Sequence, residues 1–328
     1  MAGKKIDKEI LRRLKTPESS FTSGETLARA LGISRTAVWK RIRGLKARGF
    51  SIEAQTSKGY RLCDVAEPFN EISIAAGMAT EFIGRKIHFF ESLPSTNNKA
   101  LELARTGAPE GTLIISETQT NGRGRLGREW SSPPGVNLYA SIILRPRAAA
   151  HELQGITLLG AIAVAEAVAR FSRRPPDVKW PNDILIDSKK VAGILMEMYT
   201  EAEMTSFVIA GIGVNLNMDP SILPAPLNRE ATSIKNVSKT AVARAAFTQT
   251  LCQSMESWYN TFLNKGLSAI IDAWRGYFRA EGKDVKVRSH NKTVKGICLG
   301  VNNSGALLIR DSMGVTQKIL SGDLVRGA

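Results

Sequence analysis

Glycine and arginine alternate over residues 122–128 of this chain (Gly-Arg-Gly-Arg-Leu-Gly-Arg), and Trp130 follows closely. Glycine lets the backbone approach a bound molecule, and arginine supplies a fixed positive charge with several N–H donors. A buried loop would not carry three guanidinium groups, and a flexible linker would carry serine instead. The composition therefore predicts that residues 122–128, here called the arginine-glycine loop, close over a ligand carrying or developing negative charge. Such a ligand could be a phosphate or an acyl phosphate.

The same loop matches the pattern G-x-G-x-x-G, so a dinucleotide-binding fold is the first alternative. That fold requires a preceding strand, a following helix and an acidic residue about 20 residues further on. Residues 112–116 favour a strand, but residues 133–135 (Pro-Pro-Gly) exclude a helix and residues 137–144 favour a second strand. Residues 145–147 hold no carboxylate. Because two of the three conditions fail, the sequence argues against a dinucleotide site.

Four further polar clusters lie where predicted strands or helices begin and end. Residues 95–97 (Ser-Thr-Asn) start a predicted helix that Ser95 or Thr96 caps, and its free N–H groups can bind a carboxylate or a polar ring. Residues 179–183 form a tight turn, residues 187–193 form a hairpin with two lysines, and residues 211–217 form a strand with two glycines. Each cluster alone is more often turn chemistry than a site. Together with the arginine-glycine loop they indicate one binding site.

The segments between these clusters predict a mixed α/β body. Hairpin-length loops separate several strands, so we expect the sheet to be largely antiparallel or mixed rather than doubly wound. Two amphipathic helices lead to a last segment that is long enough only for a compact β-barrel. The predicted elements are strands at 86–92, 112–117, 138–144, 178–180, 184–186, 191–198 and 206–216, helices at 95–106, 152–171, 239–263 and 267–280, and five short strands within 284–325.

The N-terminal part of the chain has the pattern of a winged helix-turn-helix. Ser23 caps a short helix that ends at Gly32, and Ser34 caps a second, basic helix over residues 35–48. Two helices joined by a three-residue turn with glycine are typical of a helix-turn-helix. A hairpin with Lys58 at its tip follows, as the wing would.

The second helix has one face suited to DNA. Val38, Ile42 and Leu45 recur at the spacing of a core-facing stripe, which leaves the opposite face to meet base edges and phosphates. The charge agrees, because residues 1–62 carry 15 basic and 5 acidic residues, whereas residues 63–282 carry 22 of each. A small helical interaction domain remains the alternative. The candidate DNA-contacting residues are Ser34, Arg35, Thr36, Lys40, Arg43 and Lys58.

Length and composition bound the remaining possibilities. A chain of 328 residues is long enough for two or three domains. The start is a charged helix rather than a signal peptide, and we find no apolar run of about 18 residues, so we expect a cytoplasmic protein with no membrane partner. Three histidines and three widely spaced cysteines (Cys63, Cys252 and Cys298) show no metal-ligand spacing. We therefore expect reduced thiols and no protein-held metal.

The order and spacing of these motifs resemble the family of bifunctional biotin–protein ligases that also repress the biotin operon. The resemblance covers nearly the whole chain and fits the longer, regulatory class of the family. It implies an α+β, multidomain fold: a winged helix over 1–65, a mixed-sheet catalytic α/β domain of the biotin/lipoate ligase type over 66–282, and an SH3-like β-barrel over 283–328. The motifs that carry it are residues 95–97, Gln119 with 122–128, 179–183, 190–195 and 211–215.

The resemblance implies a two-step reaction. The biotin carboxylate attacks the α-phosphate of ATP to give biotinoyl-5′-AMP and pyrophosphate, and a lysine on the biotin carboxyl carrier domain of acetyl-CoA carboxylase then displaces AMP. Such chemistry requires positioning and charge neutralisation more than a covalent nucleophile, and Mg²⁺ would be held mainly by the nucleotide phosphates. As a repressor, the protein would bind operator DNA as a homodimer, with biotinoyl-5′-AMP as corepressor.

Residue roles follow from the matching positions. Lys190 would hold the biotin carboxylate and the α-phosphate, and Arg125 would fold over the acyl phosphate. Asp183 would help the acceptor lysine lose its proton, because an ammonium of pKa about 10.4 cannot attack. The implied biotin-binding residues are Ser95, Thr96, Asn97, Gln119, Arg123, Gly124, Arg125 and Lys190; the implied nucleotide-binding residues are Arg128, Trp130, Asn182, Lys190 and Asn215, with Trp130 also helping to order the loop.

On chemistry alone, Lys189 could take the role assigned to Lys190 of holding the biotin carboxylate and the α-phosphate. Neighbouring side chains in an extended segment point to opposite faces, so the two lysines cannot both enter the site. Lys190 is preferred because it matches the family position directly before the Val-Ala-Gly run at residues 191–193.

Two other classes of function remain in view. A lipoate ligase would share the central fold and the adenylate chemistry, but it would have neither the arginine-glycine loop nor a reason for the winged helix. A transcription factor with a small-molecule sensing domain would keep the winged helix without adenylating its ligand.

Overall fold

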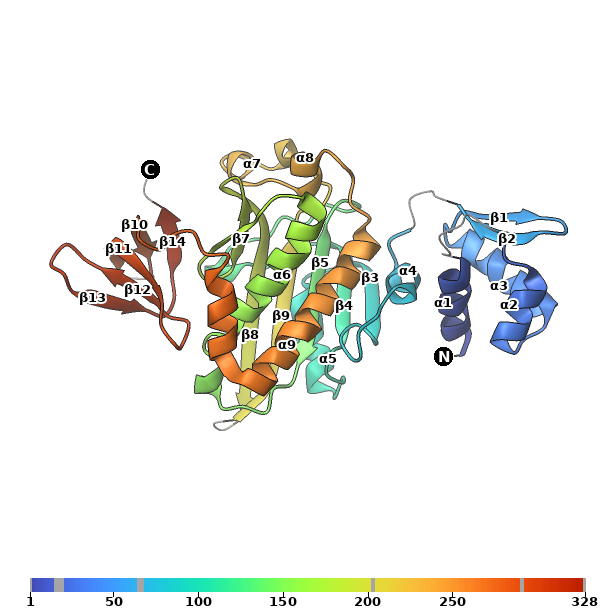
Figure 1. Ribbon diagram of the computed structural model, residues 1–328, viewed down its shortest axis with the longest axis horizontal. Coiled ribbons are helices and arrows are strands. Elements are labelled where there is room, and N and C mark those ends of the chain that lie inside the picture. The colour runs from blue at the N-terminus through green and yellow to red at the C-terminus, as the bar shows by residue number, and fades with distance from the viewer. Residues whose placement is uncertain (1, 15–20, 64–67, 202–203, 290–291, 327–328) are drawn as a thin grey trace. The chain divides into compact units, whose positions relative to one another are not determined.

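The structure is a computed structural model, and it describes residues 2–14, 21–63, 68–201, 204–289 and 292–326. The chain divides into two compact units (Figure 1). The first unit comprises the residues up to Ala79 together with Ala243–Gln249. The second comprises Thr80–Val242 and Thr250–Ala328.

The first unit is a three-helix domain with a two-stranded antiparallel sheet, followed by a short helix. The Ser23 hydroxyl accepts the N–H of Thr26 at 3.0 Å, and the helix that it caps ends at Gly32 with φ of 63°. The predicted helix-turn-helix and its wing are confirmed. The elements are α1 (Ala2–Leu14), α2 (Gly24–Leu31), α3 (Arg35–Ala47), β1 (Ile52–Gln55), β2 (Gly59–Leu62) and α4 (Glu71–Ala76).

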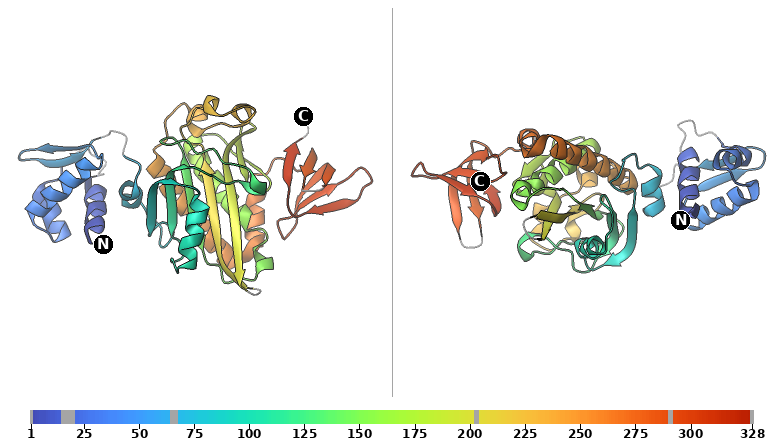
Figure 2. Two further views of the ribbon diagram at one scale, coloured as in Figure 1. Left: turned by 180° about the vertical axis from the view of Figure 1, so that it is seen from behind. Right: turned by 90° about the horizontal axis from the view of Figure 1, so that it is seen from below.

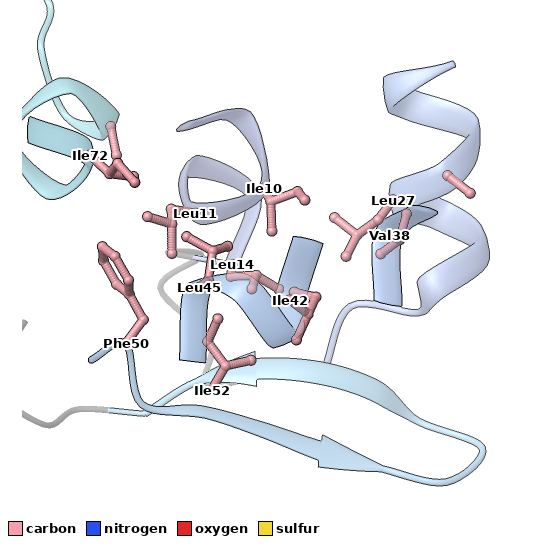
Figure 3. Packing of buried hydrophobic residues seen from close by; sticks show 12 residues of the cluster. Ile10, Leu11, Leu14, Leu27, Val38, Ile42, Leu45, Phe50, Ile52 and Ile72 are labelled. Carbon is pink, nitrogen blue, oxygen red and sulfur yellow. The ribbon is translucent and has the colours of Figure 1, made fainter. Parts of the chain in front are cut away.

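The core of this unit lies between the three helices and the wing (Figure 3). Val38, Ile42 and Leu45 of α3 are buried there, as the apolar stripe predicted. Burying this stripe fixes the rotation of α3 about its axis, so the opposite, polar face must be exposed. The other large members of the cluster are Ile10, Leu11, Leu14, Leu27, Phe50, Ile52 and Ile72.

The second unit is built on a seven-stranded sheet in the order β3-β4-β5-β9-β8-β7-β6. Strands β3 and β4 are parallel and the other neighbours are antiparallel, which confirms the predicted mixed sheet. Helix α5 lies on one face, and α6 and α9 cover the other (Figures 1 and 2). The strands are β3 (Ile87–Leu93), β4 (Leu113–Gln119), β5 (Leu138–Leu144), β6 (Asp177–Lys179), β7 (Asp183–Ile186), β8 (Lys189–Glu201) and β9 (Met204–Val214).

The helices that lie wholly or mostly in the second unit refine two predictions. Residues 150–172 are long and apolar enough by composition to cross a membrane, contrary to our expectation of no such run, but most of this stretch is buried in the unit. The predicted helix at 239–263 begins five residues late because Lys239, with φ of 60°, ends the preceding helix. The helical segments are α5 (Thr96–Arg105), η1 (Arg125–Gly127), η2 (Ala150–Leu153), α6 (Ile156–Ser172), η3 (Pro220–Ile222), α7 (Leu227–Glu230), α8 (Ile234–Ser238) and α9 (Arg244–Arg275), which is interrupted at Gly266.

The last segment forms an antiparallel sheet in the order β13-β12-β11-β10-β14, with the five predicted strands. Buried Trp180 donates its indole N–H to the carbonyl of Gly305 at 3.1 Å, which links this sheet to the turn between β6 and β7. The strands are β10 (Asp284–Arg288), β11 (Thr293–Val301), β12 (Leu307–Arg310), β13 (Thr316–Ile319) and β14 (Asp323–Arg326).

Candidate functional site

Three glycines on one face of the sheet form most of the floor of the site. Gly193 of β8 pairs with Gly213 of β9, and Gly211 follows two residues along on the same face. A Cβ at Gly213 would lie 2.4 Å from the Trp130 ring, and a Cβ at Gly211 would lie 2.2 Å from the Asn97 side chain. Both distances are far below van der Waals contact. Glycine is therefore required for Trp130 and Asn97 to lie against the sheet.

The buried residues at the start of α5 form the polar end of the pocket. The N–H of Thr96 donates to Gln119 Oε1 at 2.9 Å, so the side chain of Gln119, rather than a hydroxyl of Ser95 or Thr96, satisfies the helix start. Ser95 is the N-cap residue of this helix, as predicted, but its side chain makes no capping hydrogen bond. Because Gln119 accepts the backbone N–H of Thr96, the Ser95 hydroxyl does not have to do so and can face the pocket, which Ser95 lines.

Residues 122–130 form a hairpin loop over the glycine floor. The N–H of Trp130 donates to the Gly122 carbonyl at 2.9 Å, and the N–H of Gly124 donates to the Arg128 carbonyl at 2.7 Å. A Cβ at Gly122 would lie 2.3 Å from the Trp130 carbonyl oxygen, so this crossing requires glycine. The loop is thus closed at its base by its own backbone.

Lys190 and Arg125 form the cationic end of the pocket. Lys190 Nζ lies 2.7 Å from Asp183 Oδ1 and 5.3 Å from the centroid of the Trp130 ring. Arg125 donates to Asn182 Oδ1 at 3.1 Å, and Asn182 Nδ2 donates to a backbone carbonyl of β8 at 2.8 Å. That second bond fixes which amide atom faces the guanidinium.

Two cations beside Asp183 are partly removed from water. Burial lowers the pKa of Lys179, and the Asp183 carboxylate opposes this effect. Burial also lowers the pKa of Arg125, again against the influence of Asp183, although a guanidinium remains charged. Burial is the largest cause of both shifts, so a further negative group, such as a phosphate, would stabilise the charged forms of these two partly buried side chains.

The last strand adds a carboxylate to the same end. Asp323 at the start of β14 forms an ion pair with Arg128 and lies 3.9 Å from Arg125. Arg125 also donates to the carbonyl of Gly322 at 3.3 Å. The C-terminal sheet therefore contacts two arginines of the arginine-glycine loop.

These elements surround a cavity of about 50 Å³ that brings together most of the predicted site residues. Asp183 reaches the cavity through its ion pair with Lys190, whereas Arg128 bonds to Asp323, and Asn215 donates to the Thr232 carbonyl at 3.1 Å. These three side chains do not line the cavity themselves, and the roles of all the predicted site residues stay predictions. The predicted residues that line the cavity are Ser95, Thr96, Asn97, Gln119, Arg123, Gly124, Arg125, Trp130, Asn182 and Lys190.

The polar face of α3 forms a second candidate site, in the first unit. A groove between α3 and the wing is lined by Arg35, Thr36 and Trp39 on one side and by Gln55 and Thr56 on the other. Trp39 is half exposed, and the Arg43 guanidinium lies 5.6 Å from its ring centroid. All six predicted DNA-contacting residues (Ser34, Arg35, Thr36, Lys40, Arg43 and Lys58) are exposed.

Comparison with known proteins identifies the domains that contain the two candidate sites. An HTH domain model matches residues 7–61, the biotin/lipoate A/B protein ligase family matches residues 89–215, and the biotin protein ligase C terminal domain matches residues 282–327. The bifunctional ligase/repressor BirA of Bacillus subtilis is 37% identical over 98% of this chain and 99% of its own length. The chain belongs to the bifunctional ligase/repressor BirA family.

More distant relatives preserve this match. The BirA protein of Escherichia coli is 28% identical over 93% of this chain and 92% of its own length. A biotin protein ligase from Aquifex aeolicus, solved in complex with biotin and ATP, superposes with a TM-score of 0.64. It is 27% identical, and the match covers 74% of this chain and all of that one.

Sequence reasoning missed several residues of the BirA-type site. Glu197 and Asn98 bond to Arg123, Ser141 bonds to Asn97, and Asp323 bonds to the loop. Glu197 gave one usable signal, because it is a lone carboxylate inside an apolar strand. The contacts of the other three depend on tertiary packing that local pattern does not reveal.

The position of Lys190 generates the first prediction. Lys190→Ala should lower the rate of adenylate formation roughly 10²- to 10³-fold, the usual effect of removing one donor from a developing negative charge. Lys189→Ala should change it little, because that side chain is exposed and does not line the cavity. Pyrophosphate release with saturating biotin and ATP measures both variants. A Lys189→Ala variant that loses activity while Lys190→Ala keeps it would reverse the assignment.

Proposed function

We infer that this biotin–[acetyl-CoA-carboxylase] ligase binds biotin with the ureido ring at the polar end of the pocket and the carboxylate beside Lys190. Ser95, Thr96 and Gln119 offer hydroxyl and amide groups, which can donate to and accept from a cyclic urea. One observation carries this inference: the polar end and the cationic end line a single cavity over the glycine floor. A molecule with a polar ring at one end and a carboxylate at the other can meet both.

In the first step, a biotin carboxylate oxygen bonds to the α-phosphorus of ATP while the bond from that phosphorus to pyrophosphate breaks. Negative charge must be neutralised where the carboxylate and the phosphoryl group meet, and the Lys190 ammonium and the Arg125 guanidinium lie there. Each exchanges a protein partner for the ligand, Asp183 for Lys190 and Asn182 for Arg125. Mg²⁺ would enter with the phosphates, because the described residues contain no group of three or more metal-binding side chains.

In the second step, the amine of the acceptor lysine bonds to the acyl carbon of biotinoyl-5′-AMP, and AMP leaves. The attacking amine must lose a proton, which requires a base beside the acyl phosphate. The carboxylate of Asp183 is in contact with Lys190 and becomes available when Lys190 turns to the phosphate. Asp183 is therefore the proposed proton acceptor, and the biotin carboxyl carrier domain is the proposed partner.

The substrate assignment is tested by direct detection of the acyl adenylate. The protein, incubated with ATP, Mg²⁺ and biotin, should form biotinoyl-5′-AMP and pyrophosphate; with lipoate in place of biotin, it should form no acyl-AMP above background. Mass spectrometry of the quenched reaction measures both products. Equal yields with biotin and lipoate would contradict the assignment, and no product with either would leave the sensing-domain alternative.

The repressor activity is assigned to α3 and the wing. A single recognition helix reads too few bases to be selective, so the operator should contain two half-sites bound by a homodimer. The first unit is strongly basic and two copies would repel, so the dimer surface is proposed on the second unit. In that unit, β7 has 4 residues and β8 has 13, and the pairing between them ends at Gly193. Among the described residues, the part of β8 beyond Gly193 is therefore an edge of the sheet. Strand edges readily pair with a second copy.

The charges on α3 generate a DNA-binding prediction. Lys40→Ala with Arg43→Ala should weaken operator binding and reduce the slope of log affinity against log salt by about 1 for each phosphate that the variant no longer neutralises. Biotin transfer should not change. Arg12→Ala with Arg29→Ala is the matched control, because it removes the same charge from exposed residues of the same unit outside α3 and the wing. Equal weakening in both double variants would show that net charge, and not the α3 face, binds DNA.

A further inference from the structure

Glu197 joins the floor of the pocket to the arginine-glycine loop through one carboxylate. Its Oε2 accepts from Asn97 Nδ2 at 2.7 Å, and its Oε1 accepts from Arg123 at 2.7 Å. Asn97 belongs to the buried polar end, and Arg123 belongs to the loop that covers it. The Glu197 side chain that makes both contacts is itself largely buried, with 19% of its surface exposed.

The alternation of β8 places the carboxylate on this face of the sheet. Glu197 lies two residues beyond Leu195 and four beyond Gly193, so all three face α5 and the pocket. Met196 faces the other way, since its methyl group approaches Gly160 of α6. Every odd-numbered residue of this stretch thus faces the site, and Glu197 is the one that carries charge.

The carboxylate also determines how the Asn97 amide is oriented. Asn97 Oδ1 accepts from the Ser141 hydroxyl at 2.6 Å, and Asn97 Nδ2 donates to Glu197 and to the Leu195 carbonyl. Glu197 is acceptor-only when ionised, so it selects the amide nitrogen on its side. With Asn97 in this orientation, the Ser141 hydroxyl can donate to it, and the Ser141 and Thr96 hydroxyl oxygens lie 2.8 Å apart.

Arg123 is held by two acceptors. One guanidinium nitrogen donates to Glu197, and the other donates to Asn98 Oδ1 at 2.6 Å. Asn98 and Asn97 are neighbours on α5, so the loop is tied to the same helix that forms the polar end. A glycine-rich loop is entropically costly to order, and this tie offsets part of that cost.

We propose that Glu197 is a positioning residue that couples closure of the arginine-glycine loop to the orientation of the polar end of the pocket. This inference rests on the proposed biotin site. Glu197 does not touch the cationic end, where the reacting atoms meet. It should therefore control the binding of biotin and the retention of biotinoyl-5′-AMP, and not the rate of the chemical step.

The test replaces the carboxylate with its isosteric amide. Glu197→Gln presents an NH₂ group to one of two donors, so one of its two bonds must break. We expect KM for biotin and the dissociation rate of biotinoyl-5′-AMP to rise about tenfold, equal to about 1.4 kcal/mol, with kcat changed less than about twofold. A merely structural role would lower the Tm without this split. Glu102→Gln is the matched control, because it removes an exposed carboxylate of α5 that pairs with Lys99 and not with Arg123.

Arg123→Gln with Glu197 intact should show the same split. In the double variant, Arg123→Gln should add little to the effect of Glu197→Gln, because both substitutions act on the same Arg123–Glu197 interaction. Additive effects, or a fall in kcat with KM unchanged, would overturn the proposal. Limited trypsin digestion within residues 122–128 needs no reaction and should be faster in Glu197→Gln than in wild type. If wild type forms no biotinoyl-5′-AMP, the proposed function fails. Faster digestion would still support the loop coupling, and unchanged digestion would overturn it.

Discussion

The central pocket depends on three glycines on one face of the sheet. Gly193 and Gly213 pair across β8 and β9, and any Cβ at Gly213 would enter the Trp130 ring. The same holds for Gly211 and Asn97. Because these glycines have no side chains, the loop and the start of α5 can pack directly on the sheet. The polar end and the cationic end of the pocket are then close enough for one ligand to contact both. Substituting these glycines would displace the side chains that bind, even though the glycines themselves bind nothing.

The charges around this floor are paired with protein acceptors. Lys190 lies against Asp183, Arg123 against Glu197, and Arg128 against Asp323. Unpaired arginines would be costly in a partly buried loop, so these carboxylates stabilise the closed arrangement. A bound adenylate would replace some of them with phosphate. Ligand binding would therefore replace carboxylate partners of these cations with phosphate. The contacts of the loop with α5, β8 and β14 would change at the same time. An intermediate bound in this way would contact the strand on which we propose the dimer surface, which would link the pocket to DNA binding.

Local signals in the sequence predicted much of this molecule. Ser23, Gly32 and Ser34 marked the first helices, since caps are set by neighbouring residues. The motif at 122–128 and the lysine pair predicted where charge gathers, and the structure places Lys190 at the cavity. Tertiary contacts set the rest. Gln119 satisfies the start of α5 although it is far away in sequence, and Glu197 acts through partners that only the strand register brings near. Helix boundaries near Lys239 were missed because a left-handed lysine has no distinctive local pattern.

In this protein, formation of biotinoyl-5′-AMP in the pocket should control binding to DNA. The most direct measurement is the affinity of the full-length protein for DNA from upstream of the biotin-synthesis genes, at fixed salt, with and without biotin and ATP. Wild type should bind DNA more tightly when both are present, whereas Lys190→Ala, which should not form the adenylate efficiently, should show no change. Equal affinity of wild type in both conditions would contradict the claim and leave a ligase whose winged helix is not governed by its product.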